Sequence, residues 1–209
     1  MHAEPGSPIH LKIPFYRQHY DFTCGPASLM MAMKYLDENL RLGKGMEIDV
    51  WREATLGVVC GTSRYGLAYS AVTRGFSARV TSNTGGIDFA RWCLSRLNDP
   101  EMQMLTDLFY ERRARCRNLG VRERQERITG ETISKSLFLN HVPLIITNSL
   151  FRSREDLPHW VTVTGIDDRW MYFNDPFDTR PKQSKAGLPA LQGFIGYHGD
   201  QSMVEVWKE

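Results

Sequence analysis

Three features that would each point to a large class of proteins are missing from this sequence. Its four cysteines include no C-x-x-C pair, which argues against a structural zinc site and against a dense disulfide framework. It has no run of about 18 or more apolar residues and no basic start leading into an apolar core, so neither a membrane span nor a secretory signal is visible. The formal net charge of +2 implies no strongly charged partner. We therefore expect a cytoplasmic protein that uses no metal or cofactor and binds neither nucleic acid nor a membrane.

The composition is that of one compact unit. The chain has 209 residues, of which 42% are hydrophobic and 24% are charged, and it can bury a core as a single domain spanning 1–209. We expect helices at 26–41, 49–56, 65–75, 88–97, 100–116 and 129–140, and strands at 9–16, 76–82, 142–148, 159–166, 170–175, 194–197 and 203–207. Most of the predicted helices precede most of the predicted strands along the chain, and this order is typical of an α+β fold.

Cys24 is the most informative residue, because it lies where a loop leads into an apolar helix. Pro26 is favourable in the first helical turn, and a helix start offers unpaired N–H groups and a positive dipole end that favour a thiolate over a thiol. A cysteine beside an apolar helix often only packs. Here the small Gly25 leaves room for a substrate near the sulfur, so we interpret Cys24 as a candidate nucleophile. Gln18, six positions earlier, could fold back beside the Cys24 backbone N–H and complete an oxyanion hole.

His159 is the candidate base for this nucleophile. It opens a β-branched run that ends at Ile166, and a second strand-like run follows at 170–175 after a turn. These two runs predict a β-hairpin. The other histidines are less suitable, because they lie in the N-terminal segment, close to Cys24 in sequence, shortly before a proline or near the C-terminus. They are His2, His10, His19, His141 and His198.

The hairpin brings a possible partner to His159. If its turn centres on Asp167, His159 and Asp175 face each other, with Cβ atoms about 5 Å apart. Asp175 would then accept one imidazole N–H and leave the other ring nitrogen for Cys24. A one-residue change in the turn would present Asn174 instead, and asparagine can also orient a histidine. A hairpin with chance polar ends is the remaining alternative.

Together these residues resemble the C39 and C39-like cysteine peptidases of the papain-like superfamily. The resemblance covers 9–40 and 140–198, whereas about 85–130 carries no matching motif and is expected to be a helical insertion. Pro158 stands where many relatives have glycine. The residues that carry the resemblance are Gln18-x5-Cys24-Gly25-Pro26-Ala27, His159-Trp160-Val161-Thr162-Val163 and Asn174-Asp175-Pro176.

The resemblance implies a papain-like fold in which an N-terminal helical part, carrying the nucleophile helix, packs on a C-terminal antiparallel sheet. It also implies hydrolysis of a peptide or another amide bond through a covalent acyl-enzyme. Four roles follow from it: Cys24 as nucleophile, His159 as general base and acid, Asp175 as the residue that orients His159, and Gln18 as an oxyanion donor.

The same resemblance implies a substrate. C39 peptidases cut after paired small residues, so we expect cleavage of unstructured peptides after Gly-Gly or Gly-Ala. The bulky Trp160 agrees with a narrow acyl side, and we expect Gly25, Trp160 and Asn174 to contact the substrate. Two alternatives stay open: an acyl or peptidyl transferase that uses the same residues, and a module that binds a peptide or leader without cutting it. A partner protein that supplies the substrate also stays open.

Two further features have both a structural and a functional explanation. Residues 111–127 hold seven arginines interspersed with three glutamates, which favours a solvated helix face over nucleic-acid binding. A lid or wall of the substrate cleft is the functional alternative, and the polar loop 149–158 is a second candidate for the cleft border. We expect Cys60 and Cys93 to be buried and Cys116 to be exposed.

Overall fold

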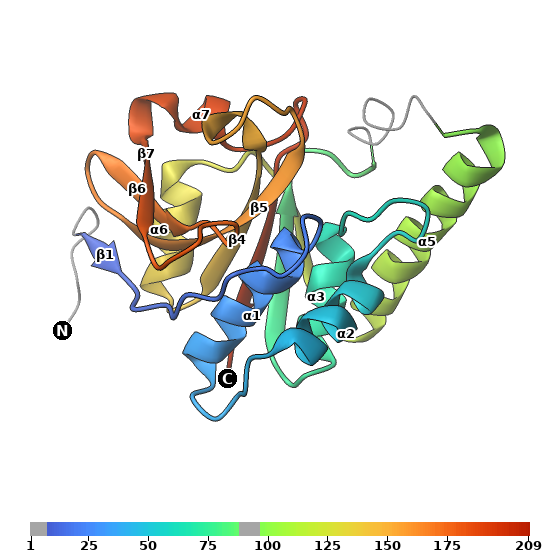
Figure 1. The fold of residues 1–209 in the computed structure, drawn as a ribbon, viewed down its shortest axis with the longest axis horizontal. Helices are drawn as coiled ribbons and strands as arrows, with labels where there is room; N and C mark the ends of the chain where they lie inside the picture. The colour runs from blue at the N-terminus through green and yellow to red at the C-terminus, as the bar shows by residue number, and fades with distance from the viewer. Residues whose placement is uncertain (1–7, 88–96) are drawn as a thin grey trace.

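The computed structural model describes residues 8–87 and 97–209, and it is built around one large sheet (Figure 1). Its strands are β1 Ile9–His10, β2 Ser77–Ser82, β3 Arg122–Gln125, β4 Val142–Asn148, β5 Pro158–Ile166, β6 Trp170–Asn174, β7 Gln183–Gly187 and β8 Ser202–Trp207. The strand order is β3-β2-β8-β4-β5-β6-β7, with β1 added to β5, and the pairing is antiparallel apart from the β2–β3 pair. The predicted α+β class is confirmed, and the sheet also takes strands from the first half of the chain.

Helices pack on both faces of this sheet. They are α1 Cys24–Leu36, α2 Lys44–Ala54, α3 Arg64–Val72, α5 Asp99–Asn118, α6 Gly130–Phe138 and α7 Leu191–Phe194, with short 3-10 helices η1 Ser149–Phe151 and η2 Leu188–Ala190. Leu144 and Trp160 point into a core shared with α1, α2, α3 and α5. Their strand neighbours Ile145 and Val161 point into a second core shared with α6 and α7, because successive side chains of a strand alternate between faces.

The helix α1 is central to the first core. Its first ten residues are all buried, and in Figure 1 it crosses the middle of the sheet, while α5 lies at the outer edge. It begins at Cys24 and ends at Leu36, earlier at both ends than the predicted 26–41. None of the helices in the described parts of the chain is long and apolar enough to cross a membrane.

Several predicted elements differ from the observed ones. The strand predicted at 194–197 is wrong, because Phe194 ends α7 and Ile195 and Tyr197 form only isolated bridges. The sequence does not predict β3 or β7, which are the two outermost strands of the sheet order. Outer strands are commonly polar, and these two lack the apolar alternation that marks a strand. The helix predicted at 88–97 lies outside the described residues.

Candidate active site

Side-chain hydrogen bonds dock α1 on β5 and thereby place Cys24. The Ser28 hydroxyl donates to the carbonyl oxygen of Trp160 over 3.2 Å, and the Thr162 hydroxyl donates to the carbonyl oxygen of Ser28 over 3.0 Å. Cys24 lies one helical turn before Ser28, and His159 lies at the start of β5. The loop-to-helix junction therefore meets the beginning of the central strand.

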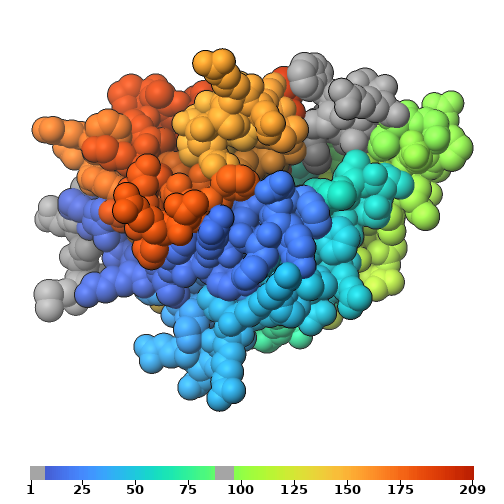
Figure 2. Space-filling view, in the orientation of Figure 1, coloured from blue at the N-terminus to red at the C-terminus, as the bar shows by residue number. Residues whose placement is uncertain are grey.

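Three side chains from distant parts of the sequence form a row at this junction. The side chains of Cys24 and His159 interact electrostatically, and His159 Nε2 lies 2.7 Å from Oδ1 of Asp175. Because Nε2 is occupied by Asp175, Nδ1 is the ring nitrogen left for the sulfur. All three side chains are at least nine-tenths buried. Figure 2 shows the N-terminal segment lying beside segments from the last third of the chain on one face of the molecule.

The pKa shifts of these groups favour the charged pair. Burial alone would raise the pKa of the Cys24 thiol, but the hydrogen bond and the charge of His159 outweigh burial and lower it. Burial alone would lower the pKa of His159, but its hydrogen bonds to Asp175 and Cys24 raise that pKa to about 9. Burial would raise the pKa of Asp175, yet His159 holds it below its usual value. These shifts all favour the charged forms, namely a thiolate on Cys24, an imidazolium on His159 and a carboxylate on Asp175.

The hairpin that carries His159 and Asp175 is present, but its predicted register is wrong. His159 and Asp175 are not directly opposed, because near the turn Ile166 pairs with Met171, and beyond a bulge at Thr164 Val163 pairs with Phe173. Continuing that second register puts Asp175 opposite Val161, so that it is a diagonal neighbour of His159 on the same face. The bulge at Thr164 therefore determines that Asp175 shares a face of the hairpin with His159. If the register near the turn continued without the bulge, Asn174 would lie on that face instead.

Asp175 has further partners that the sequence does not reveal. Its Oδ1 also accepts the backbone N–H of Phe177 over 3.0 Å, and its Oδ2 forms an ion pair with Nε of Arg152 at 3.1 Å. The Arg152 guanidinium in turn stacks over the Phe177 ring at 3.8 Å. The only sequence signal for Arg152 is its place in the loop 149–158, whose entry into His159 marks it as a cleft border. These contacts hold the carboxylate in place beside the imidazole.

Gln18 lies between the Asp175 loop and the start of α1. Its backbone N–H donates to the carbonyl oxygen of Pro176 over 2.8 Å, and its side-chain Nε2 donates to the carbonyl oxygen of Tyr20 over 2.7 Å. The same Tyr20 carbonyl accepts the backbone N–H of Thr23, the residue before Cys24. Among the described residues, the buried Oε1 of Gln18 has no hydrogen-bond partner. An amide nitrogen carries two hydrogens, so Nε2 retains one donor beyond the bond to Tyr20.

The expected substrate-contacting residues have different surroundings. A Cβ on Gly25 would lie 2.2 Å from Oγ1 of Thr62 and 3.2 Å from Cδ1 of Trp160, so only glycine fits without a shift of its neighbours. Trp160 is buried, and its indole N–H contacts the carbonyl oxygen of Thr62 at 3.4 Å. Asn174 points to the opposite face of the hairpin from Asp175, where its amide donates to the carbonyl oxygen of Ile13. Its assignment to substrate binding stays a prediction.

The expectations for the other cysteines need correction. Cys60, predicted to be buried, is exposed, because it lies in the loop between α2 and α3. Cys116, predicted to be exposed, is fully buried in α5, and burial raises the pKa of its thiol to about 12. Cys93 lies outside the described residues. Of the three described cysteines, Cys24 has the thiol whose pKa is lowered.

The arginine-rich segment is not one helix face. It contains the end of α5, a turn at Gly120 with φ of 81°, and the edge strand β3. Arg113 and Arg117 both bind Glu123, with Nη2 of Arg113 2.6 Å from Oε2 and Nε of Arg117 2.9 Å from Oε1. These ion pairs tie α5 to the outermost strand of the sheet. A role of the segment as a lid stays a prediction.

Comparisons with known proteins agree with this architecture. The fold is similar to that of a solved structure from Bacillus anthracis that is described as C39-like. That structure aligns with a TM-score of 0.57 and 15% identity over 97% of this chain and 99% of the other. The chain belongs to the Peptidase_C39 like family, whose family model matches residues 13–191.

A second solved structure is a double glycine motif protease from an AMS/PCAT transporter in complex with the leader peptide. It aligns with a TM-score of 0.47 and 15% identity over 95% of this chain and 96% of that one. A comparison with curated proteins found no match.

Proposed function

We propose that this protein is a cysteine peptidase that hydrolyses a peptide or a related amide bond through a covalent acyl-enzyme. The observation that carries the proposal is that His159 interacts with Cys24 and is hydrogen-bonded to Asp175, in a chain of the Peptidase_C39 like family. A thiolate beside an imidazolium is a strong nucleophile that already has a proton donor for the leaving group.

In the proposed first step, the Cys24 thiolate attacks the carbonyl carbon of the substrate and the carbonyl oxygen becomes an oxyanion. The free N–H of Gln18 Nε2 and the backbone N–H of Cys24 donate to that oxygen, each contributing about 3 kcal/mol in comparable sites. His159 then gives its proton to the leaving amine as the carbon–nitrogen bond breaks. Asp175 keeps the imidazole oriented throughout.

In the second step, water attacks the thioester and His159 takes one of its protons. The carbon–sulfur bond breaks, the acid product leaves, and the thiolate–imidazolium pair returns. If an amine replaced water in this step, the same residues would perform acyl transfer. Product analysis separates the two reactions, because hydrolysis leaves a free acid and transfer leaves a new amide.

The proposed substrate is an unstructured peptide with small residues before the cleaved bond. The crowding of Thr62 and Trp160 against Gly25 supports this assignment, because side chains already fill the space beside the nucleophile. A residue without a large side chain fits there best. Cleavage after Gly-Gly or Gly-Ala is therefore the expected specificity, and the cytoplasm is the expected compartment.

The test is mass spectrometry of the protein incubated with a panel of peptides that differ only before the cleaved bond. We expect free acid products from the Gly-Gly and Gly-Ala peptides and a transient acyl adduct on Cys24. Cys24→Ala should lose both, whereas Cys60→Ala, which removes an exposed thiol, should keep both. If only peptides with large residues before the cleaved bond were hydrolysed, the proposed preference for small residues would be wrong. If no peptide were hydrolysed, the proposed peptidase activity would be wrong.

A further inference from the structure

Glu47, on α2, is a buried carboxylate that the steps above do not use. Its side chain is 0% exposed. Its carboxylate is 2.8 Å from the backbone N of His19, 2.7 Å from His19 Nδ1, 2.5 Å from the Thr23 hydroxyl and 3.0 Å from the Tyr16 hydroxyl. A buried carboxylate is tolerated only where donors surround it, and here four donors do so.

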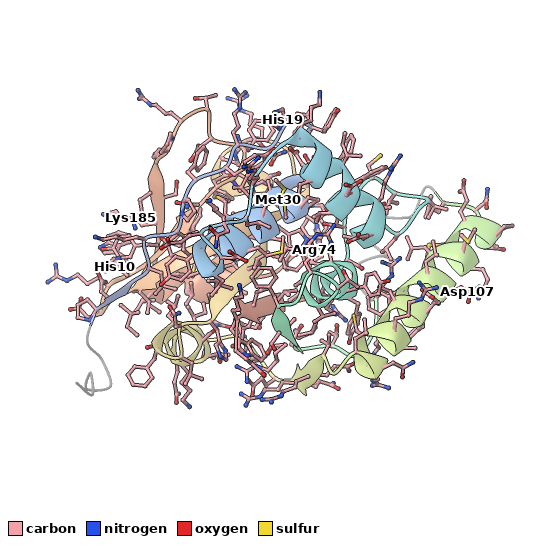
Figure 3. The ribbon with its side chains drawn as sticks, turned by 90° about the horizontal axis from the view of Figure 1, so that it is seen from below. His10, His19, Met30, Arg74, Asp107 and Lys185 are labelled. Atoms are coloured by element: carbon pink, nitrogen blue, oxygen red, sulfur yellow. The ribbon has the colours of Figure 1, made fainter. Side chains whose placement is uncertain are left out.

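All four donors belong to the loop 16–23, which leads from the candidate oxyanion donor to the candidate nucleophile. Gln18 is inside this loop, and Cys24 follows its last residue directly. Figure 3 shows His19 beside one end of α2, the helix that carries Glu47. The Glu47 carboxylate therefore binds residues at both ends of the loop 16–23. The shape of this loop sets the positions of the Gln18 amide and of the Cys24 backbone N–H.

The contact with Thr23 also affects the start of α1. Thr23 is the N-cap residue, yet its hydroxyl caps no backbone N–H of the helix. A threonine at this position commonly accepts such a bond, but this hydroxyl is turned toward Glu47 and toward the carbonyl oxygen of Tyr20. The first N–H groups of α1 are thus left for acceptors other than the Thr23 hydroxyl.

We propose that Glu47 is a positioning residue that holds the oxyanion hole in shape. The inference rests on the proposed peptidase function. Glu47 acts on Gln18 and on the first N–H groups of α1 through the loop 16–23, whereas the charged pair of Cys24 and His159 is held by β5 and Asp175. Loss of Glu47 therefore impairs stabilisation of the oxyanion and leaves the thiolate reactive.

Two reactions of Cys24 separate these effects. In alkylation by iodoacetamide, the sulfur forms a bond to the methylene carbon as iodide leaves, and no oxyanion develops. In acylation by a peptide, negative charge accumulates on the carbonyl oxygen and needs donors. A change confined to the oxyanion hole slows acylation alone, whereas damage to the whole junction slows both reactions.

The experiment compares both rates at neutral pH in the unmodified protein and in Glu47→Gln. An amide in place of the carboxylate turns its NH₂ group toward donors, so the loop must shift. We expect acylation by a Gly-Gly peptide to slow by about 100-fold, the effect of losing one oxyanion donor, with alkylation changed by less than about threefold. Gln18→Ala should behave alike, and the double variant should lose little more, because both act on one hole.

Matched variants complete the design. Glu53→Gln alters another carboxylate of α2, which binds Arg74 and Ser70 and not the loop 16–23, and should leave both rates unchanged. If Glu47→Gln fails to fold by circular dichroism, Thr23→Val removes one of the donors at similar size and should give the same selective loss of acylation.

The inference is overturned if acylation and alkylation fall together in the folded variants, or if neither changes. A wild-type protein that is alkylated at Cys24 but acylated by no peptide overturns the proposed function, and this inference with it.

Discussion

The two sides of the candidate site are held in place by different kinds of structure. His159 and Asp175 belong to a hairpin inside a large sheet, where backbone pairing with neighbouring strands sets their positions. Gln18 lies in a loop and Cys24 at the start of a helix. The side chain of Glu47 accepts hydrogen bonds there from the backbone N–H of His19 and from the Thr23 hydroxyl. We therefore expect the positions of His159 and Asp175 to tolerate single side-chain changes away from the reacting atoms. The positions of Gln18 and Cys24 are expected to depend on the buried carboxylate of Glu47.

The largest expected effect is the loss of turnover when the contact between the two sides is broken, because no group is then left to protonate the leaving amine. His159→Ala removes the imidazolium that lowers the pKa of the Cys24 thiol, and burial then raises that pKa. We expect iodoacetamide labelling of Cys24 at pH 7 to slow by at least about 30-fold, since an ordinary thiol is only a few per cent ionised there. Peptide mapping measures the rate, with the exposed Cys60 as an internal reference. In the wild type Cys24 should be labelled first, and faster labelling of Cys60 would contradict the charged pair.

The second prediction concerns the two neighbouring candidates on the hairpin. Asp175→Ala should lower kcat/KM on the order of 100-fold or more, because the imidazole loses the partner that orients it. Asn174→Ala, on the other face, should lower stability by about 1 kcal/mol through the lost bond to Ile13 and change kcat/KM by less than about fivefold. Steady-state kinetics and thermal denaturation measure both. The reverse ranking would mean that Asn174 faces His159 in solution.

The third prediction tests the bulge that decides this face. A Cβ on Gly165 would lie 2.5 Å from the carbonyl oxygen of Ile9 and 2.6 Å from Nδ1 of His10, so β1 must move away in Gly165→Ala. We expect a loss of about 1–3 kcal/mol in the free energy of unfolding, with a parallel loss of activity if the register slips. Gly45→Ala has nothing within 4 Å of its new Cβ and should not destabilise. Equal stability of both variants would show that β1 does not constrain the bulge.

The smallest expected effect is on the pH profile. His159 must be protonated to release the amine, and its pKa of about 9 predicts that kcat/KM is flat near neutrality and falls above pH 9. On the acid side the rate falls where the lowered pKa of Cys24 is crossed and the thiolate gains a proton. Arg152→Gln removes a positive charge beside Asp175, so the proton on His159 is held more strongly and the alkaline limb moves up by a fraction of a pH unit.

Arg154→Gln is the matched control for that shift, because it changes the net charge equally from an exposed position in the same loop. Its alkaline limb should stay where the wild-type limb is. Equal movement in both variants would assign the effect to net charge and not to the contact with Asp175.

The sequence carries clearer signals for the residues of the candidate site than for their arrangement. Cys24 is marked by local signals, namely a small residue and a proline at the start of an apolar helix, and α1 begins there. His159 is marked by the β-branched run that becomes β5. Arg152 and Glu47 carry no such signal, because their positions beside the site follow from the way distant elements pack. The outer strands β3 and β7 are missed for a related reason, since a polar segment pairs only where a neighbouring strand offers its edge.

The sequence by itself determined the class of fold and the existence of α1 and of the hairpin, because each depends on residues close together in the chain. Only the tertiary structure decided which side chain of the second strand faces His159. Around the bulge, the carbonyl oxygen of Thr164 accepts the backbone N–H of Leu11 over 2.7 Å, and Gly165 pairs with His10. A contact between two segments far apart in the sequence thus holds the register, and a one-residue shift exchanges the faces of a strand.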